Sequence, residues 1–431
     1  MFIGGNWLLP TLNGELYLTK PPFYYWMSLV ISSFVGYVNE WTLRLPSALA
    51  AIVTLWATYQ YTFKKFGAWP ALFSAQILIA NAGYAMLARR AEIEMLLAAL
   101  CAGAMLSALQ SLESQQKQRW INLSYFLLAL AVLSKGPVAM LFVTLPLVVA
   151  AIWARDYKIK GVLTNLIGWG IFLVVSLSWY LAVSLQLGFD IWAIIARRDM
   201  LEKIQAAEVA KPFLSYLGWI TVDFLLLIAL LFIKPKKLIQ ANAERLEWKV
   251  IITAVLIPLI IFSLFSNKHA KYLLPVYPFI AIVLGVQLGL IFDQAGARIK
   301  NVILMFGVLL PSIFVFFYMF AEARVFDYRT SAFPKFKVWS DAHLKAHLYA
   351  VGDIDSRLVY YSDIPITMLG KDEVVAMKNV KKSFLLLAEA DGIRQVSALS
   401  DCTVEEFKPY LKRHKVLTVL GFGEACDAKN N

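Results

Sequence analysis

Positively charged side chains recur in short polar segments between long apolar runs, an arrangement that suits the binding of a phosphate. Lys20 directly precedes Pro21-Pro22 and the aromatic group Phe23-Tyr24-Tyr25-Trp26. Prolines restrict the backbone after the lysine, and tyrosine and tryptophan favour the membrane interface. The sequence therefore predicts an ammonium at the depth of the lipid headgroups, where it would meet a lipid phosphate. The alternative is a lysine that merely extends from a helix end into the headgroup layer.

Two glutamates are candidates for acid–base chemistry. Glu92 and Glu94 are two residues apart, so on a helix they point in different directions, and only one is expected to enter a shared site. The alternative for both is ion pairing with Arg89 and Arg90.

A second lysine group follows much later in the chain. Lys268 is three residues from Lys271 and four from Tyr272, so the three share a face if a helix begins early enough. The alternative is that both lysines only anchor a helix end. Asp223 lies inside an apolar run, where a charge costs roughly 2.5–3.5 kcal/mol. We expect Asp223 to face the interior of a helix bundle in a structural hydrogen bond.

Membrane-spanning helices must position these residues. Of 431 residues, 60% are hydrophobic and 16% are charged, against roughly 45–50% and 25% in soluble proteins. A soluble globule and a disordered chain are excluded, and we predict a polytopic α-helical membrane protein. About ten spans are expected, at residues 42–63, 67–88, 93–112, 120–134, 137–154, 162–186, 212–233, 249–266, 272–292 and 302–322. The stretch 22–38 is expected to be a short span or an interfacial helix that ends at Gly36.

Alternating the loops across the membrane predicts which face is cytoplasmic. With 22–38 interfacial, one face collects 14 lysines and arginines and the other collects 11. The richer face is expected in the cytoplasm, and positive charge is disfavoured in short loops of the other face. A phosphate-bearing lipid would explain why this second face retains Lys20, Arg44, Arg89, Arg90, Lys135, Arg197, Arg198, Lys203, Lys211, Lys268 and Lys271.

The charge balance and the metal-binding residue types limit the partners. The net charge is +12, and in a membrane protein anionic lipid is a better partner for it than nucleic acid. Three cysteines and four histidines show no ligand spacing, so the sequence indicates no zinc, haem or redox site. A divalent metal remains open as a cofactor.

A soluble domain is expected after the membrane part. Thirty of the residues from 323 onward are charged, against 40 of the preceding 322. We therefore predict three regions: a partial first external loop with an interfacial helix (1–41), a multi-span domain (42–322) and a small external α/β domain (323–431). Strands are expected at 357–361, 383–388 and 416–420. Cys402 and Cys426 both lie in this domain, where a disulfide and two free thiols are the alternatives, whereas Cys101 lies in a span.

The motifs of the membrane part resemble one family. The stretch GNWLLPTLNGELYLTKPPFYYW (5–26) is similar to the first external loop of the membrane-embedded GT-C glycosyltransferases of the protein O-mannosyltransferase and lipid A aminoarabinose transferase (ArnT-like) type. Later motifs agree in order: Arg44-Leu45-Pro46-Ser47, 88–97 (ARRAEIEMLL), Leu133-Ser134-Lys135-Gly136-Pro137, Ser178-Trp179-Tyr180 and 263–278 (SLFSNKHAKYLLPVYP).

The resemblance implies a donor in which a sugar is linked to polyprenyl phosphate. It assigns donor-phosphate binding to Lys20, Lys135, Lys268, Lys271 and Tyr272, and a supporting acidic role to Glu94. Secondary candidates are Arg89, Arg90, Glu92 and Arg197. The family also has a first span and an Asp-Glu pair with the catalytic Asp, and these would precede Gly5. We expect that the start of this sequence is internal to a longer gene, with a degenerate family member as the alternative.

The function expected from these residues is glycosyl transfer by a hexosyl- or pentosyltransferase. A sugar would move from a polyprenyl-phosphate donor to a lipid A, glycan or protein acceptor on the periplasmic side of a bacterial inner membrane. The chain is expected to be a multi-pass monomer with a periplasmic C-terminal domain. The alternatives are a transporter or flippase of lipid-linked sugars, which typically has paired broken helices, and a non-catalytic truncated remnant.

Overall fold

The computed structural model describes residues 1–2, 4–197, 211–225, 227–321, 332–343, 348–352, 355, 357–362, 366–408 and 416–429. These residues form two compact units. The first comprises Met1–Pro10 and Tyr17–Phe314, and the second comprises Thr11–Leu16 and Val315–Asn431. The hairpin at 11–16 is thus grouped with the C-terminal residues, and the domain boundaries expected at 41 and 322 stay predictions.

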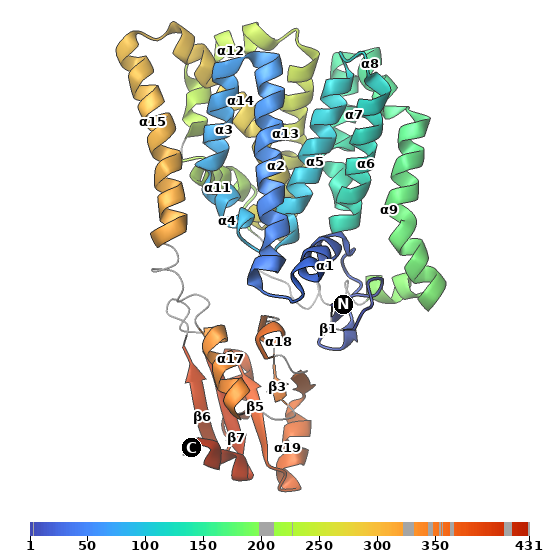
Figure 1. The fold of residues 1–431 in the computed structure, drawn as a ribbon, viewed down its shortest axis with the longest axis vertical. Coiled ribbons are helices and arrows are strands. Elements are labelled where there is room, and N and C mark those ends of the chain that lie inside the picture. The colour runs from blue at the N-terminus through green and yellow to red at the C-terminus, as the bar shows by residue number, and fades with distance from the viewer. Residues whose placement is uncertain are drawn as a thin grey trace. The chain divides into compact units, whose positions relative to one another are not determined.

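The first unit is a bundle of helices (Figure 1). Its first helix, α1 (Phe23–Val35), begins after Pro21-Pro22 and ends at Gly36, whose positive φ of 88° terminates the helix as the sequence predicts. The following elements are α2 (Glu40–Phe66), α3 (Ala68–Ile79), α4 (Ala82–Ala88), α5 (Ile93–Ser111), α6 (Lys117–Lys135), η1 (Pro137–Leu141), α7 (Thr144–Ala154), α8 (Tyr157–Leu163), α9 (Leu166–Leu187), α11 (Ser215–Asp223), η2 (Leu227–Phe232), α12 (Pro235–Asn242), α13 (Leu246–Leu264), η3 (Ala270–Val276), α14 (Tyr277–Gln294) and α15 (Ala297–Phe316). The last two residues of α15 and the short η4 (Phe317–Ala321) fall in the second unit.

The polytopic helical fold is confirmed. Within the described part of the chain, six helical segments are long and apolar enough to cross a membrane. These are Ile93–Ser111, Pro137–Ala154, Tyr157–Leu187, Leu246–Leu264, Ala270–Gln294 and Ala297–Phe320. The pair α3 and α4, bent by 66°, adds a seventh if it is one broken span. Three further spans were expected, at 42–63, 120–134 and 212–233. They coincide with α2, with α6 and with α11 plus η2, which are more polar or shorter than the six segments named above.

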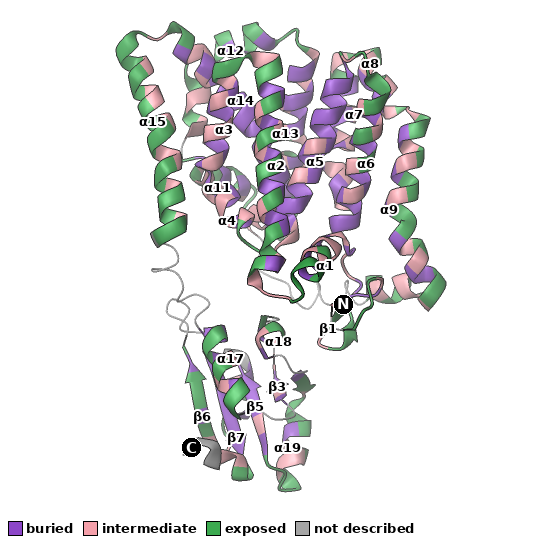
Figure 2. Cartoon of the chain, viewed as in Figure 1, coloured by how far each residue is buried: buried purple, intermediate pink, exposed green. Residues whose placement is uncertain are grey.

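The centre of the bundle is formed by α5 and α14, which are buried along most of their length, whereas α9 and α15 lie at opposite flanks and are largely exposed (Figures 1 and 2). Small residues allow the central helices to approach closely. A Cβ at Gly285 of α14 would lie 2.1 Å from Ser74 Oγ and 2.7 Å from the Pro70 carbonyl oxygen of α3. Glycine is therefore required at this helix crossing.

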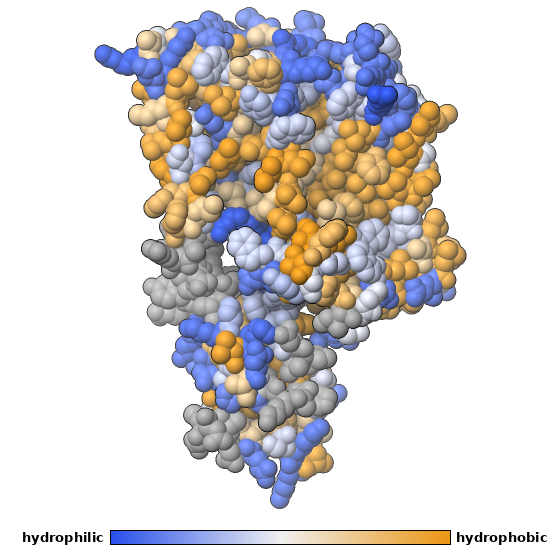
Figure 3. All heavy atoms as spheres, viewed as in Figure 1, coloured by the Kyte–Doolittle hydropathy of each residue, from blue (hydrophilic) through white to orange (hydrophobic). Residues whose placement is uncertain are grey.

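Polar and apolar surfaces are separated along the helices. Apolar side chains cover the middle of the bundle, and hydrophilic ones gather at the end that carries α8 and α12 (Figure 3). At that end Lys65 of α2 forms ion pairs with Glu113 and with Glu247 of α13, the latter at 3.0 Å. A hydrogen bond with Glu247, and then one with Lys65, lowers the pKa of Glu113 to about 2. This end therefore satisfies its buried charges internally.

The second unit is a small α/β domain, as the sequence predicts. Its five-stranded sheet has the order β4-β3-β5-β7-β6, in which β4, β3 and β5 are parallel, while β7 is antiparallel to β5 and β6. The short β1 (Thr11–Leu12) and β2 (Glu15–Leu16) form a separate hairpin. The other elements are α17 (Ala332–His343), β3 (Leu348–Val351), α18 (Arg357–Ser362), β4 (Ile366–Leu369), α19 (Lys371–Asn379), β5 (Phe384–Ala388), α20 (Ala390–Val396), β6 (Cys402–Phe407), β7 (Leu417–Phe422) and η6 (Gly423–Lys429).

Two of the three expected strands are confirmed, as β5 and β7. The strand expected at 357–361 is wrong, because these residues form helix α18. Leu358 and Ser362 are the buried residues of α18, and their spacing of four is helical. A short apolar run does not distinguish the two structures by periodicity alone.

Cys402 of β6 and Cys426 of η6 form a disulfide, with Cα atoms 5.9 Å apart. The bond closes a loop across a sequence separation of 24, and we expect it to stabilise the second unit by about 3 kcal/mol in the chain-entropy model. Replacing Cys402 by serine should lower the thermal unfolding temperature of the full chain, as should a reductant. The Cys402→Ser/Cys426→Ser double variant is the control, because it should not respond further to reductant. Free thiols at both positions in the untreated protein would contradict the disulfide.

Candidate functional site

The first of the two glutamates, Glu92, lies in the turn between α4 and α5. It is the N-cap residue of α5 and has extended backbone, with φ −128° and ψ 143°. Arg90 donates to Glu92 Oε1 at 3.3 Å. The Ser47 hydroxyl of α2 donates to the backbone carbonyl of Glu92 at 3.2 Å. The backbone and the side chain of Glu92 are therefore held from two directions.

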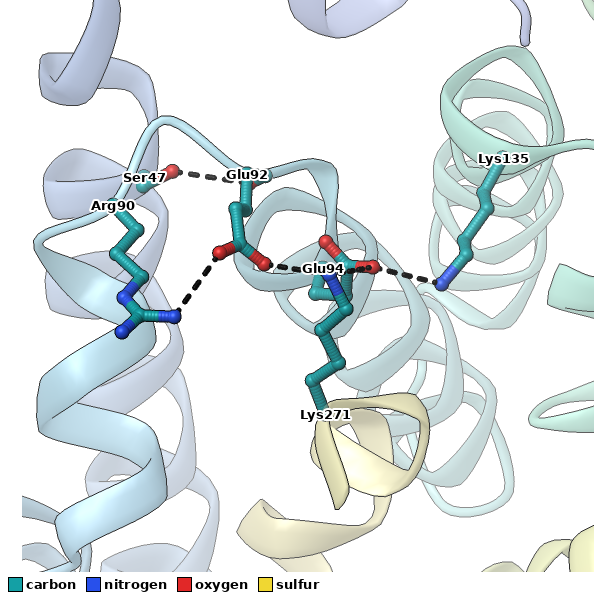
Figure 4. A network of polar contacts seen from close by, with 6 residues as sticks. All are labelled: Ser47, Arg90, Glu92, Glu94, Lys135 and Lys271. Atoms are coloured by element: carbon teal, nitrogen blue, oxygen red, sulfur yellow. Dashed lines mark hydrogen bonds and ion pairs between the residues drawn. The ribbon is translucent and has the colours of Figure 1, made fainter. Parts of the chain in front are cut away.

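Glu94 lies in the first turn of α5, and only 5% of its surface is exposed. Lys135 approaches from the end of α6, with its Nζ 3.2 Å from Glu94 Oε1. The helix ends there because Gly136 follows with a φ of 83°. Lys271 Nζ lies 3.4 Å from the same oxygen. Two ammonium groups from different elements thus share one buried carboxylate (Figure 4).

Lys271 comes from η3 and connects the two glutamates. Its Nζ also lies 2.9 Å from Glu92 Oε2. The Lys271 side chain is 37% exposed and that of Lys135 is 16% exposed, so Lys271 is the more accessible of the two. The neighbouring Tyr272 places its ring 4.5 Å from Lys135 Nζ, a favourable cation–π contact. The geometry therefore brings Glu92, Glu94, Lys135, Lys271 and Tyr272 together.

The prediction that only one of the two glutamates enters a shared site is wrong, since both contact Lys271. The helical spacing argument fails because Glu92 precedes the first turn of α5 and has extended backbone. Ion pairing of Glu92 with Arg90, the alternative in the sequence analysis, is also present. Glu92 therefore contacts both Arg90 and Lys271.

Lys20 is brought toward this network by hydrophobic packing. Leu18 and Leu133 are buried in one cluster with Trp179, and each lies two residues before Lys20 or Lys135 in the sequence. The positive charge of Lys20 acts unfavourably on that of Lys135, as expected for neighbouring ammonium groups. Lys20 forms no hydrogen bond or ion pair with any residue that the structure describes.

Lys268 is placed differently from Lys271. It is 2% exposed, and its Nζ donates to the backbone carbonyls of Lys211 and Phe265. In return, Lys211 Nζ donates to the Lys268 carbonyl at 2.7 Å. The shared face expected for Lys268, Lys271 and Tyr272 does not form, because η3 begins at Ala270 and leaves Lys268 outside it. Lys268 holds two backbone segments together rather than joining the Glu94 network.

Three other candidates lie outside the Glu94 network. Arg89 is exposed at the C-cap of α4, and Arg197 is exposed in the helical run 191–197. Asp223 accepts a hydrogen bond from the Tyr277 hydroxyl and packs at Gly83, where a Cβ would lie 2.5 Å from Asp223 Oδ2. The expected hydrogen bond between Asp223 and a neighbouring helix is confirmed, since Tyr277 belongs to α14. Arg198 and Lys203 lie outside the described residues.

Sequence reasoning did not assign a role to Tyr24 or Ser47. Their hydroxyl oxygens are 2.9 Å apart, and the Tyr24 hydroxyl also donates to the Leu43 carbonyl. Burial raises the pKa of Tyr24 to about 12, so this hydroxyl stays protonated. The pair connects α1 to α2 and, through Ser47, to Glu92. The only sequence signal was that both residues fall in the motifs at 5–26 and 44–47.

No group of three or more histidine, cysteine, aspartate or glutamate side chains that could hold a metal is found among the described residues. The cluster around Glu94 combines ammonium, guanidinium and carboxylate groups. Such a cluster can bind an anion and stabilise negative charge that develops on it.

Comparisons with known proteins agree with the sequence motifs. Residues 19–180 match the family model described as dolichyl-phosphate-mannose-protein mannosyltransferase. An undecaprenyl phosphate-alpha-4-amino-4-deoxy-L-arabinose arabinosyl transferase of Pseudomonas fluorescens is 26% identical over 75% of this chain and 57% of its own length. A protein of the same name from Shewanella sediminis is 27% identical over 74% of this chain and 59% of its own length.

The solved structures give the fold. The crystal structure of ArnT from Cupriavidus metallidurans bound to undecaprenyl phosphate matches with a TM-score of 0.76 and 19% identity, covering 97% of this chain and 91% of that chain. The expected resemblance is confirmed. The chain has the GT-C membrane fold, and it spans less than two thirds of the length of the two arabinosyl transferases that it matches.

Because Glu94 contacts both Lys135 and Lys271, we expect its substitution to affect turnover more than the substitution of Glu92. Glu94→Gln should lower turnover of a polyprenyl-phosphate sugar at least tenfold, because Lys135 and Lys271 both lose the charge that orients them. Glu92→Gln should have a smaller effect, since the Glu92 side chain is more exposed and contacts only one of these lysines. Initial rates in membranes are compared after matching protein amount and thermal stability, because breaking a buried ion pair also destabilises the fold. Equal or reversed effects would contradict this assignment.

Proposed function

We propose that this chain binds the phosphate of a polyprenyl-phosphate sugar with Lys20, Lys135 and Lys271 and takes part in glycosyl transfer. The observation that carries the proposal is the convergence of Lys135 and Lys271 on one Glu94 oxygen, with Lys20 nearby and without a partner among the described residues. Arg90, Lys135 and Lys271 supply three positive charges to this cluster against two carboxylates, and Lys20 adds a fourth. The surplus positive charge suits a phosphate ligand.

The reaction explains why lysines are the central residues. The bond between the anomeric carbon and the phosphate oxygen breaks, and its electron pair stays on the phosphate. A new bond forms between the anomeric carbon and an acceptor oxygen, whose proton passes to a base. Ammonium groups stabilise the negative charge on the departing phosphate, so no strong acid is needed at the leaving group. Glu94 serves as a supporting acidic residue that orients two of these lysines.

The carboxylates also define how a phosphate would enter. Lys271 is bound to Glu92 and Glu94 and is the more exposed of the two paired lysines. A donor phosphate would replace these carboxylate contacts one by one. When polyprenyl phosphate leaves, the lysines would form their ion pairs with the carboxylates again. The ion pairs thus keep the lysines charged and ordered between turnovers.

The sugar is a hexose or pentose, and the acceptor is lipid A, a glycan or a protein on the periplasmic side of a bacterial inner membrane. The names of the two arabinosyl transferases support the polyprenyl-phosphate donor. Membrane lipids are the other partners, the protein acts as a monomer, and residues 323–431 form its periplasmic domain. The similarity to a transferase fold over 97% of the chain favours transfer over transport.

Lys20 gives the direct test. Lys20→Ala should reduce transfer from an undecaprenyl-phosphate sugar by one to two orders of magnitude, because hydrogen bonds to charged groups contribute about 1.5–3 kcal/mol. Transfer to lipid A is measured in membranes that contain the full chain, together with binding of undecaprenyl phosphate. Lys64→Ala is the matched control, since Lys64 is an exposed lysine in the last turn of α2. Wild-type transfer by the Lys20 variant would remove Lys20 from the site.

A further inference from the structure

The motif Ser178-Trp179-Tyr180 lies in the second half of α9, which packs against α6 in the first unit (Figure 1). Helix α6 is the helix that ends at Lys135. Trp179 is buried in one cluster with Leu133, which lies two residues before Lys135 in the sequence. The motif is therefore next to the end of α6 that carries one lysine of the proposed phosphate site.

The Tyr180 hydroxyl lies close to the backbone that directly follows Lys135. A Cβ at Gly136 would lie 3.9 Å from the Tyr180 hydroxyl oxygen. Apart from the residues that adjoin Gly136 in the sequence, no other heavy atom of the described chain lies within 4 Å of that position. The space beside Gly136 is thus open, and one polar group borders it. A glycine also allows a ligand to approach the backbone closely.

The hydrogen-bonding state of this hydroxyl differs from that of Tyr24 in α1. The Tyr24 hydroxyl donates to the Leu43 carbonyl, whereas the Tyr180 hydroxyl forms no hydrogen bond with any residue that the structure describes. Tyr180 is half-buried. A hydrogen bond from Tyr180 to a ligand would therefore replace no hydrogen bond within the described part of the fold.

Aromatic packing and hydrogen bonds hold Tyr180 in place. Its ring centroid lies 5.0 Å from that of Trp179 and 5.1 Å from that of Trp192. The Trp192 indole N–H donates to Ser184 Oγ at 2.7 Å, and the Ser184 hydroxyl donates to the Tyr180 carbonyl at 2.8 Å. The Trp179 indole N–H donates to the Leu8 carbonyl at 2.9 Å. The Tyr180 ring is therefore ordered, which lowers the entropy that a contact with a ligand would cost.

We propose that Tyr180 binds the sugar of the polyprenyl-phosphate donor, by donating a hydrogen bond from its hydroxyl to a sugar oxygen. This inference rests on the proposed function, because it needs the donor phosphate at the lysines. The sugar is bonded directly to that phosphate, so it must occupy space that adjoins these lysines, and the open space beside Gly136 adjoins Lys135. A neutral hydroxyl suits the neutral oxygens of a sugar, while the ammonium groups suit the phosphate.

The alternative is that Tyr180 only anchors α9 at the membrane interface, where tyrosine and tryptophan are enriched. Such an anchor depends on the amphipathic side chain and not on a bound sugar. Its loss would change the amount or the thermal stability of the protein, but it would not distinguish a lipid phosphate that carries a sugar from one that does not.

The test variant is Tyr180→Phe, which removes the hydroxyl and keeps the ring that contacts Trp179 and Trp192. The matched control is Tyr157→Phe, because Tyr157 is an exposed tyrosine in the first turn of α8, at the other end of the bundle (Figure 1). Equal thermal unfolding temperatures of the two variants and the wild type verify that the fold is intact.

The measurement is the affinity of the full chain in membranes for three probes. These are undecaprenyl phosphate, undecaprenyl phosphate glucose and undecaprenyl phosphate 4-amino-4-deoxy-L-arabinose, whose sugar occurs in the names of the two matched transferases. The wild type should bind at least one sugar-bearing probe more tightly than undecaprenyl phosphate. Tyr180→Phe should raise the dissociation constant of that probe about three- to tenfold, as expected for one hydrogen bond. Its affinity for undecaprenyl phosphate should stay within about twofold of the wild type, and Tyr157→Phe should change neither value.

The possible contrary results are distinguishable. An equal loss of affinity for undecaprenyl phosphate would overturn the sugar contact and assign the hydroxyl to the phosphate. Unchanged affinities in Tyr180→Phe would overturn the proposal in favour of an interfacial anchor. A wild type that binds undecaprenyl phosphate but neither sugar-bearing probe more tightly would overturn the sugar contact alone. Absence of binding of all three probes by the wild type would overturn the proposed function as well.

Discussion

The ion pairs that Lys135 and Lys271 form with a single oxygen of Glu94 constrain much of the first unit. Burying a charge without a partner is strongly unfavourable, so the ends of the three elements that supply these groups must meet. Gly136 ends α6 directly after Lys135, and the turn after α4 starts α5 directly before Glu94. The short η3 then delivers Lys271 at the same place. The positions at which these helices begin and end are therefore matched to one carboxylate.

The sequence predicts most of the architecture because long apolar runs and turn residues act locally. The end of α1 at Gly36, the run that becomes α5 and the strands β5 and β7 all follow from such local signals. The strand predicted at 357–361 is wrong because a short apolar segment fits the periodicity of a helix as well as that of a strand. The same kind of local signal gave the correct prediction for β5 and β7. Tertiary packing of Leu358 decides in favour of the helix.

The candidate site was less predictable, because its members depend on where each helix begins. Glu92 could be excluded from a site shared with Glu94 only if α5 began before it, and in fact α5 begins one residue after it. Likewise, Lys268 would have shared a face with Lys271 only if a helix included both, and η3 begins between them. Helix boundaries shift by one or two residues for small differences in energy. Residue type and spacing therefore identify the lysines as candidates, but do not determine which of them meet.

Both ends of the bundle contain ion pairs between lysine and glutamate, but the ratio of lysines to carboxylates differs between them. At the end near α8, one lysine, Lys65, lies between two carboxylates, Glu113 and Glu247. At the other end, two lysines lie at one carboxylate, Glu94, and Lys20 adds a further positive charge nearby. The ion pairs of the first arrangement contain more acidic than basic groups. The second has positive charge in excess, and a phosphate group would balance it. We base the proposed phosphate site on this asymmetry rather than on the presence of buried ion pairs as such.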